Sequence, residues 1–338
     1  MPSAVDTLAV DELWPRERNR AIKLRAKPLS WVALGLLVTA TQFALGANPS
    51  PSNTAPPAVE VRTILTGEYG FAHPTGLAYL TMRHVLLVAA AGQGRTRLLR
   101  LDPFEHALGT FNLPTLNASA LSFDPAGARL MALSGKKLIT VPSGHLEGGK
   151  PPVRIVDIGS LGIRNPQGAT FDPAKRIWLI LDAESRSIVR VSASGRLRRS
   201  TISLELGDKG RLRGLARNPT DGLLYVASPD KGLLYGVRPS GKARKVYSIK
   251  DAALQHLRDL IFAPSADPTD PPATQHLYVA DSGSASRPGR VIELSLEPAV
   301  ELAETVQGRL GRTIETGRLR LPSLPILPES HTSLPATR

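Results

Sequence analysis

Short apolar segments separated by turn residues recur along the middle of the chain, and their lengths are those of β-strands. The most apolar segments stand at 85–89 (VLLVA), 129–134 (RLMALS), 177–182 (IWLILD), 223–228 (LLYVAS) and 276–281 (HLYVAD). They lack the 3.6-residue periodicity of amphipathic helices, which excludes a helical solenoid. Continuous apolar runs are typical of strands buried on both faces of a sheet. The pattern therefore predicts an all-β protein.

These runs belong to a longer unit that repeats about every 46 residues, within the range of propeller blades. Five segments that precede the runs align with one another, and their anchor residues Gly76, Ala120, Gly168, Gly214 and Asp259 are 44, 48, 46 and 45 residues apart. A proline follows the anchor by five residues in four of the repeats, at Pro125, Pro173, Pro219 and Pro264. Proline and glycine at such places favour a tight hairpin turn after the first strand.

Each unit predicts four strands that become more polar from first to last. The third strands are expected at 97–101, 137–141, 187–191, 233–237 and 290–294, and the fourth at 107–113, 153–158, 198–204, 244–249 and 301–306. Charged residues on an outer strand discourage pairing between sheets of different molecules. A β-sandwich would not need a four-stranded unit at a fixed period. We therefore predict a β-propeller with five clear blades and a degenerate sixth blade built from 61–66 and 309–321. A ring of five blades stays open as the alternative.

The amino-terminal region has the pattern of an export signal. Residues 15–27 are strongly basic, and residues 29–47 carry no charge over a length that can span a membrane. We expect a basic region at 1–28, a signal peptide or signal-anchor helix at 29–47 and a Pro/Ser linker at 48–58. The propeller is expected at 59–308 and a Pro-rich tail at 309–338. The charge asymmetry would place the propeller in the periplasm or outside the cell, cleaved or anchored to the inner membrane.

The composition limits the chemistry. The absence of cysteine excludes disulfides and thiolate metal sites. The chain has no Gly-x-Ser-x-Gly, His-Glu-x-x-His or P-loop motif. The net charge of +13 favours anionic partners. A basic group predicted on two adjacent blades comprises Arg196, Arg198, Arg199, Arg211, Arg217, Lys242, Arg244 and Lys245. Export and the scarcity of aromatic residues, 5% of the chain, argue against nucleic acid.

Residues 165–191 (NPQGATFDPAKRIWLILDAESRSIVRV) and residues 258–294 with their YVADS segment resemble NHL-repeat propellers. This resemblance covers about residues 60–307 and implies a binding scaffold. A related six-bladed group includes gluconolactonase-type and paraoxonase-type lactonases, which hold a divalent cation in the channel with Glu, Asn and Asp. The resemblance would place Asn165 and Asp259 as ligands, for which Ca²⁺ is the fitting cation. The chain departs from that pattern, since no Glu is obviously placed there and Arg213 and Arg258 bring positive charge.

The loops that lead into the first strands and those between the second and third strands should open on one face of the ring. This loop face is expected to carry His73, Asn117, Asn165, Gln167, Arg213, Asp259, Asp182 and Asp281. An Asp after an apolar strand can instead cap the turn through backbone amides, and His73 can be a hydrogen-bonded loop residue.

We therefore expect a monomeric, non-catalytic scaffold. It would bind a protein, an anionic polymer or a membrane surface through the loop face, without a cofactor. The alternative is a cation-dependent lactonase or esterase that uses the central channel.

Overall fold

The computed structural model describes residues 55–92, 95–113, 117–146, 153–192, 200–296 and 300–301. Within these ranges the chain forms β-strands and four short 3-10 turns, at Thr66–Tyr69, Ser143–His145, Gly159–Leu161 and Pro229–Lys231. No helix in this part of the chain is long and apolar enough to cross a membrane. The predicted segments at 1–28, 29–47 and 309–338 and most of the linker lie outside the described residues, so these predictions remain untested.

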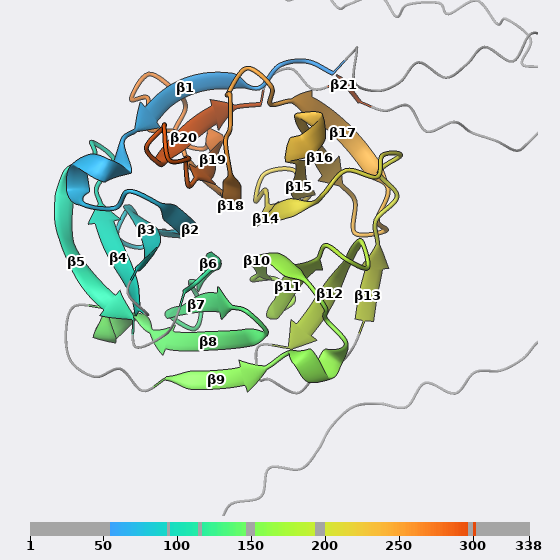
Figure 1. The fold of residues 1–338 in the computed structure, drawn as a ribbon, viewed down its shortest axis with the longest axis horizontal. Helices are drawn as coiled ribbons and strands as arrows, with labels where there is room; N and C mark the ends of the chain where they lie inside the picture. The colour runs from blue at the N-terminus through green and yellow to red at the C-terminus, as the bar shows by residue number, and fades with distance from the viewer. Residues whose placement is uncertain are drawn as a thin grey trace, which may run out of the picture. The chain divides into compact units, whose positions relative to one another are not determined.

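Five antiparallel sheets, or blades, surround a central axis (Figure 1). Blade 1 contains β2 (Pro74–Leu80), β3 (Val85–Gly92), β4 (Arg95–Leu101) and β5 (Ala107–Leu113). Blade 2 contains β6 (Ala120–Asp124), β7 (Arg129–Ser134), β8 (Lys137–Pro142) and β9 (Arg154–Asp157). Blade 3 contains β10 (Pro166–Asp172), β11 (Ile177–Asp182), β12 (Ser187–Ser192) and β13 (Ser200–Ser203). The four-stranded unit predicted from the sequence is confirmed in these blades.

The last two blades use strands from more distant parts of the chain. Blade 4 contains β14 (Arg213–Arg217), β15 (Leu224–Ser228), β16 (Leu233–Val237), β17 (Ala243–Ser248) and an added β21 (Val300–Glu301). Blade 5 contains β18 (Leu257–Pro264), β19 (Gln275–Asp281) and β20 (Arg290–Ser295), and its outer strand is β1 (Val59–Ile64). The amino-terminal strand therefore completes the last blade.

The pairing of β1 with β20 closes the ring. Val59 lies opposite Ser295, and Ile64 lies opposite Val291. The expected fourth strand at 301–306 does not fill this place, because its described residue Glu301 pairs with Lys245 of β17 instead. Each innermost strand contacts the next, and β18 contacts β2 directly. The described part of the chain therefore forms five blades without a sixth, and segment 309–321 lies outside it.

The hydrophobic core is divided among the interfaces between neighbouring blades, each of which is filled by one cluster of buried side chains. The alternation along β15 shows how a strand serves two interfaces. Tyr225 and Ala227 pack toward blade 5, whereas Leu224 and Val226 pack toward blade 3. Because successive side chains point to opposite faces of a strand, a blade between two neighbours needs apolar residues at every position. This explains the continuous apolar runs in the sequence.

Small anchor residues allow the innermost strands to converge at the axis. A Cβ on Gly168 would lie 2.6 Å from the carbonyl carbon of Gly214 and from the backbone nitrogen of Leu215. A larger residue therefore cannot stand at Gly168 without moving the neighbouring strand. The strand β18 also contacts β6 and β10 across the axis, so the centre of the ring is crowded by backbone.

Candidate functional site

Asp259, the anchor residue of blade 5, fills the axis and is fully buried. Its Oδ2 accepts hydrogen bonds from the backbone N–H of Leu77 at 2.9 Å and of Leu121 at 3.0 Å, and its Oδ1 accepts one from Leu260 at 3.0 Å. One carboxyl group thus links blades 5, 1 and 2. Burial raises the pKa of Asp259 well above its usual range, an effect that the three N–H donors partly offset.

Asn165 and Asp259 do not share a site in the described structure. Asn165 is exposed in the loop before β10, and its side-chain oxygen accepts a hydrogen bond from the Gln167 amide at 2.5 Å. The oxygens of Asp259 accept only backbone N–H groups. Among the described contacts, Asp259 forms no ion pair with an arginine. No group of three or more metal-ligating side chains was found among these residues.

Asp182 and Asp281 cap loops at equivalent places in blades 3 and 5. Asp182 accepts hydrogen bonds from the backbone N–H of Asn165 at 2.8 Å and of Arg164 at 3.3 Å. Asp281 accepts them from His256 at 2.7 Å and Gln255 at 3.1 Å. Both carboxylates therefore bind backbone amides of the loop that leads into the first strand of their blade. The amide hydrogen bonds lower the pKa of Asp182 although its burial acts in the opposite direction.

The remaining loop-face residues form two hydrogen-bonded groups near the axis. In one, the Arg213 guanidinium donates to the side-chain oxygen of Gln167 at 2.7 Å. In the other, Arg258 Nε donates to the Ser282 hydroxyl at 3.0 Å, and His73 Nδ1 lies 2.8 Å from the Ser282 carbonyl oxygen. His73 is therefore a hydrogen-bonded loop residue. Asn117 is exposed at the entrance to β6 with a φ of 44°.

Arg213 and Arg258 line one cavity of about 170 Å³ together with Arg211 and His256. Arg211 already pairs with Asp230, with Nε–Oδ2 and Nη2–Oδ1 distances of 2.8 Å. Arg213 and Arg258, by contrast, form no ion pair within 4.0 Å among the described residues, although Asp230 also lines the cavity and its charge acts on Arg213. Burial, followed by the charges of Arg258 and Arg211, lowers the pKa of Arg213. We call this hollow the arginine pocket; it has the charge and the donors to receive an anion.

The predicted basic group does not form one patch. Arg211 lies in the loop before β14, and Arg217 is the last residue of that strand. Arg217 lies near Asp172 on the opposite face, with a 3.9 Å Nε–Oδ1 distance. Lys245 pairs with Asp221 at 3.2 Å. Arg196, Arg198 and Arg199 lie outside the described residues, and Lys242 and Arg244 stand at the outer edge of blade 4.

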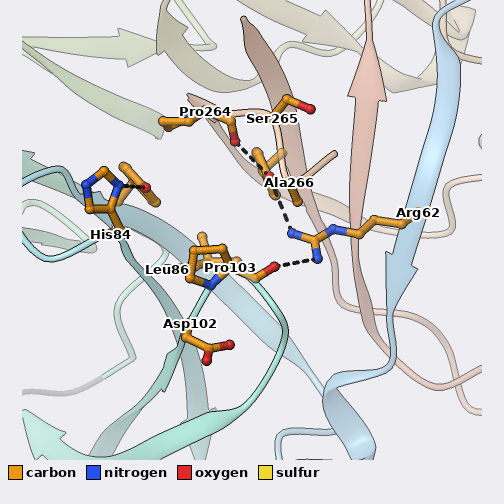
Figure 2. A pocket seen from close by; sticks show the side chains of 10 residues that line it. Arg62, His84, Leu86, Asp102, Pro103, Pro264, Ser265 and Ala266 are labelled. Atoms are coloured by element: carbon orange, nitrogen blue, oxygen red, sulfur yellow. Dashed lines mark hydrogen bonds between the residues drawn. The ribbon is translucent and has the colours of Figure 1, made fainter. Parts of the chain in front are cut away.

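A smaller cavity of about 100 Å³ lies between blades 5 and 1 beside Arg62 (Figure 2). Arg62 donates to the Pro103 carbonyl at 3.0 Å and pairs with buried Glu293 at 2.6 Å. Glu293 also accepts from His276, 2.7 Å away. Because these polar groups bond to one another, the cluster fastens β1 to the ring and is not a free binding site.

A third hollow, of about 360 Å³, lies at the opposite end of the axis from the arginine pocket. All five blades contribute to its lining at the turns that follow their first strands. The four prolines that follow the anchor residues by five positions also line this hollow: Pro125, Pro173, Pro219 and Pro264. The sequence repeat therefore contained the signal for this hollow, whereas the polar candidate residues stand on the other face.

Searches for relatives by sequence found no match to a family model and none to a curated protein. The fold, however, has solved counterparts. The structure is similar to Myxococcus xanthus glutaminyl cyclase, with 13% identity and a TM-score of 0.51 over 73% of this chain and 97% of that one. Further matches are a nidogen/laminin complex, at 14% identity over 62% of this chain and 73% of that one with a TM-score of 0.45, and a streptogramin B lyase, at 13% identity over 67% and 84% with a TM-score of 0.42.

At this level of identity the comparisons show the β-propeller fold alone. The glutaminyl cyclase is an enzyme by its name, so catalysis is not excluded. The NHL-repeat resemblance remains a prediction from the sequence. Function must be argued from the site, because one fold serves many functions.

Proposed function

We propose that this protein is an exported, non-catalytic β-propeller that binds an acidic protein or an anionic polymer through its loop face. The observation that carries the proposal is the arginine pocket. Arg213 and Arg258 line it together, and the side-chain hydrogen bonds that they donate within the described residues go to neutral oxygens of Gln167 and Ser282. A carboxylate or phosphate placed between the two guanidinium groups would relieve their mutual repulsion and gain charge-assisted hydrogen bonds.

The geometry gives less support to a lactonase. That mechanism would require Asn165 and Asp259 to turn oxygens toward a common cation. Those oxygens accept hydrogen bonds from Gln167 and from three backbone amides instead. Binding a cation at Asp259 would require its amide hydrogen bonds to be broken in the fully buried axis, at a cost of about 1–3 kcal/mol for each polar group left unpaired.

The test is a binding titration of the full chain with poly-L-glutamate as the anionic probe, with inorganic polyphosphate in parallel. Arg213→Gln and Arg258→Gln should each weaken binding at least tenfold, because a hydrogen bond to a charged group contributes about 1.5–3 kcal/mol. Binding should also weaken as salt is added. Arg164→Gln is the matched control, since Arg164 is an exposed arginine of the same face that pairs with Glu184 at 3.1 Å. Equal binding by the Arg213 and Arg164 variants would refute the proposal.

Export is tested separately by fractionating cells that make the native protein. We expect it in the periplasm, in the medium or in the inner membrane, because residues 29–47 form an uncharged apolar run behind a basic region. A soluble cytoplasmic protein with an intact amino terminus would contradict this part of the proposal without affecting the arginine pocket.

A further inference from the structure

The hollow opposite the arginine pocket, which we call the axial funnel, has a regular lining. The residue three positions after each anchor lines it, and this residue is aromatic in four of the five blades: Tyr79, Phe123, Phe171 and Phe262. In blade 4 the same position holds Arg217, whose charge faces buried Asp172. The volume of about 360 Å³ is within the usual range for ligand pockets.

The chemistry of the axial funnel suits an apolar ligand with a stiff backbone. The funnel differs from the arginine pocket in that its aromatic rings come from blades 1, 2, 3 and 5, and Pro125, Pro173, Pro219 and Pro264 stand around its mouth. Its single arginine is already near a carboxylate, so the funnel offers little free charge. Surfaces lined by aromatic side chains recognise polyproline II segments, which lose little entropy on binding because their backbone is already extended.

The carboxyl-terminal tail contains a segment of this kind. Residues 321–328 read LPSLPILP, so that Leu-Pro occurs three times at intervals of three residues. A polyproline II helix has three residues per turn, which would align Leu321, Leu324 and Leu327 along one edge and the prolines along another. The segment contains no charged residue, which matches the apolar lining of the axial funnel.

The chain is long enough for the tail to reach the axial funnel. Glu301, the last described residue, lies on β21 at the outer edge of blade 4. Nineteen residues lie between Glu301 and Leu321, and the twenty steps from one to the other can extend to about 66 Å. A domain of this size has a radius of gyration of only about 18 Å, so the linker spans from the edge of the ring to its axis with length to spare.

We propose that the Leu-Pro segment 321–328 docks in the axial funnel of its own chain. The prolines and leucines then pack between the aromatic rings of neighbouring blades. The segment covers the apolar end of the axis and leaves the arginine pocket on the other face open to its partner.

The test uses cysteine cross-linking in the full chain, which has no cysteine of its own. One variant combines Thr81→Cys, at the exposed rim of the axial funnel, with Ser323→Cys in the Leu-Pro segment. The matched control combines Ser323→Cys with Lys231→Cys, an exposed position between β15 and β16 on the loop face. Under mild oxidation, we expect the first pair to form an intramolecular disulfide at least ten times faster than the control pair.

The Leu-Pro motif is tested by adding Leu321→Ser, Leu324→Ser and Leu327→Ser to the first variant. We expect the rate of disulfide formation to fall to that of the control, because the same tether would then lack the apolar residues that dock. Equal rates for the two cysteine pairs, an unchanged rate in the serine variant, or a disulfide that joins two chains would each overturn the proposal.

Discussion

The buried carboxyl of Asp259 offers the sharpest test of how the axis is held together. In Asp259→Asn the amide oxygen can still accept from Leu77 and Leu121, but its NH₂ group then faces the N–H of Leu260. One buried donor loses its acceptor, which costs about 1–3 kcal/mol. Asp259→Ala would leave all three N–H groups unpaired at roughly three times that cost, comparable with the whole stability of about 5–15 kcal/mol. The Asn variant is therefore the informative one.

The cost of Asp259→Asn should depend on pH. The folded-state pKa of Asp259 is raised, so folding favours the protonated carboxyl group. Its contribution to stability is fully present below about pH 4 and decreases by up to about 1.4 kcal/mol per pH unit as pH rises toward the folded-state pKa. Asparagine does not titrate. The difference in stability between the wild type and Asp259→Asn should therefore be largest near pH 4 and should narrow at higher pH.

The measurement is urea unfolding between pH 4 and pH 8, followed by circular dichroism and by the fluorescence of buried Trp178. The control is Asp251→Asn, an exposed aspartate in the loop before β18, which should change stability by less than about 0.5 kcal/mol. If Asp259→Asn is as stable as the wild type at pH 4, where the difference should be largest, the carboxyl group does not link the three blades. If the difference instead grows with pH, the inferred direction of the pKa shift is wrong.

Three further predictions concern the ring. Gly168→Ala should destabilise the fold by about 1–3 kcal/mol in urea, because the new Cβ meets the backbone of Gly214. Gly67→Ala, with nothing within 4 Å of the new Cβ, should have little effect on stability. Equal losses of stability in the two variants would refute the close approach of backbones at the axis. Glu293→Gln should cost about 3 kcal/mol by weakening a buried ion pair, whereas Glu184→Gln at the surface should cost less than about 1 kcal/mol. Circular dichroism of the full chain should show mostly strand, and a helix content above about a third would contradict the propeller.

The repeat made most of the propeller predictable, whereas its closure was not. The apolar runs at 85–89, 129–134 and 177–182 lie within β3, β7 and β11, because strands between two blades must be apolar on both faces. Segments 61–66 and 301–306 both have the polar pattern of an outer strand, and a strand pattern does not specify its partner. In the structure β1, and not segment 301–306, pairs with β20 as the outer strand of blade 5, so the ring closes with five blades.

The site was predicted less well, because the partners of its buried carboxyl group are backbone amides, whose positions a sequence pattern does not reveal. Asp259 stood out as the one charged anchor, but its partners are backbone N–H groups, which every residue except proline carries. The prediction that the basic residues form one patch was wrong for a different reason. Arg211 and Arg217 are close in sequence, yet Arg211 precedes β14 and lines the arginine pocket, whereas Arg217 ends β14 and lines the axial funnel.

The pairing of β1 with β20 also sets an order of events during synthesis. The ion pair between Arg62 and Glu293 joins residues separated by 231 positions. At a translation rate of about 5–20 residues per second, the first strand must wait roughly 10–50 s for its partner to leave the ribosome. Throughout that time the nascent chain is an open arc with an unpaired strand at its beginning. A chaperone or an export receptor that binds unfolded segments would therefore find β1 accessible until β20 has been synthesised, and a chain terminated before residue 290 could not close the ring.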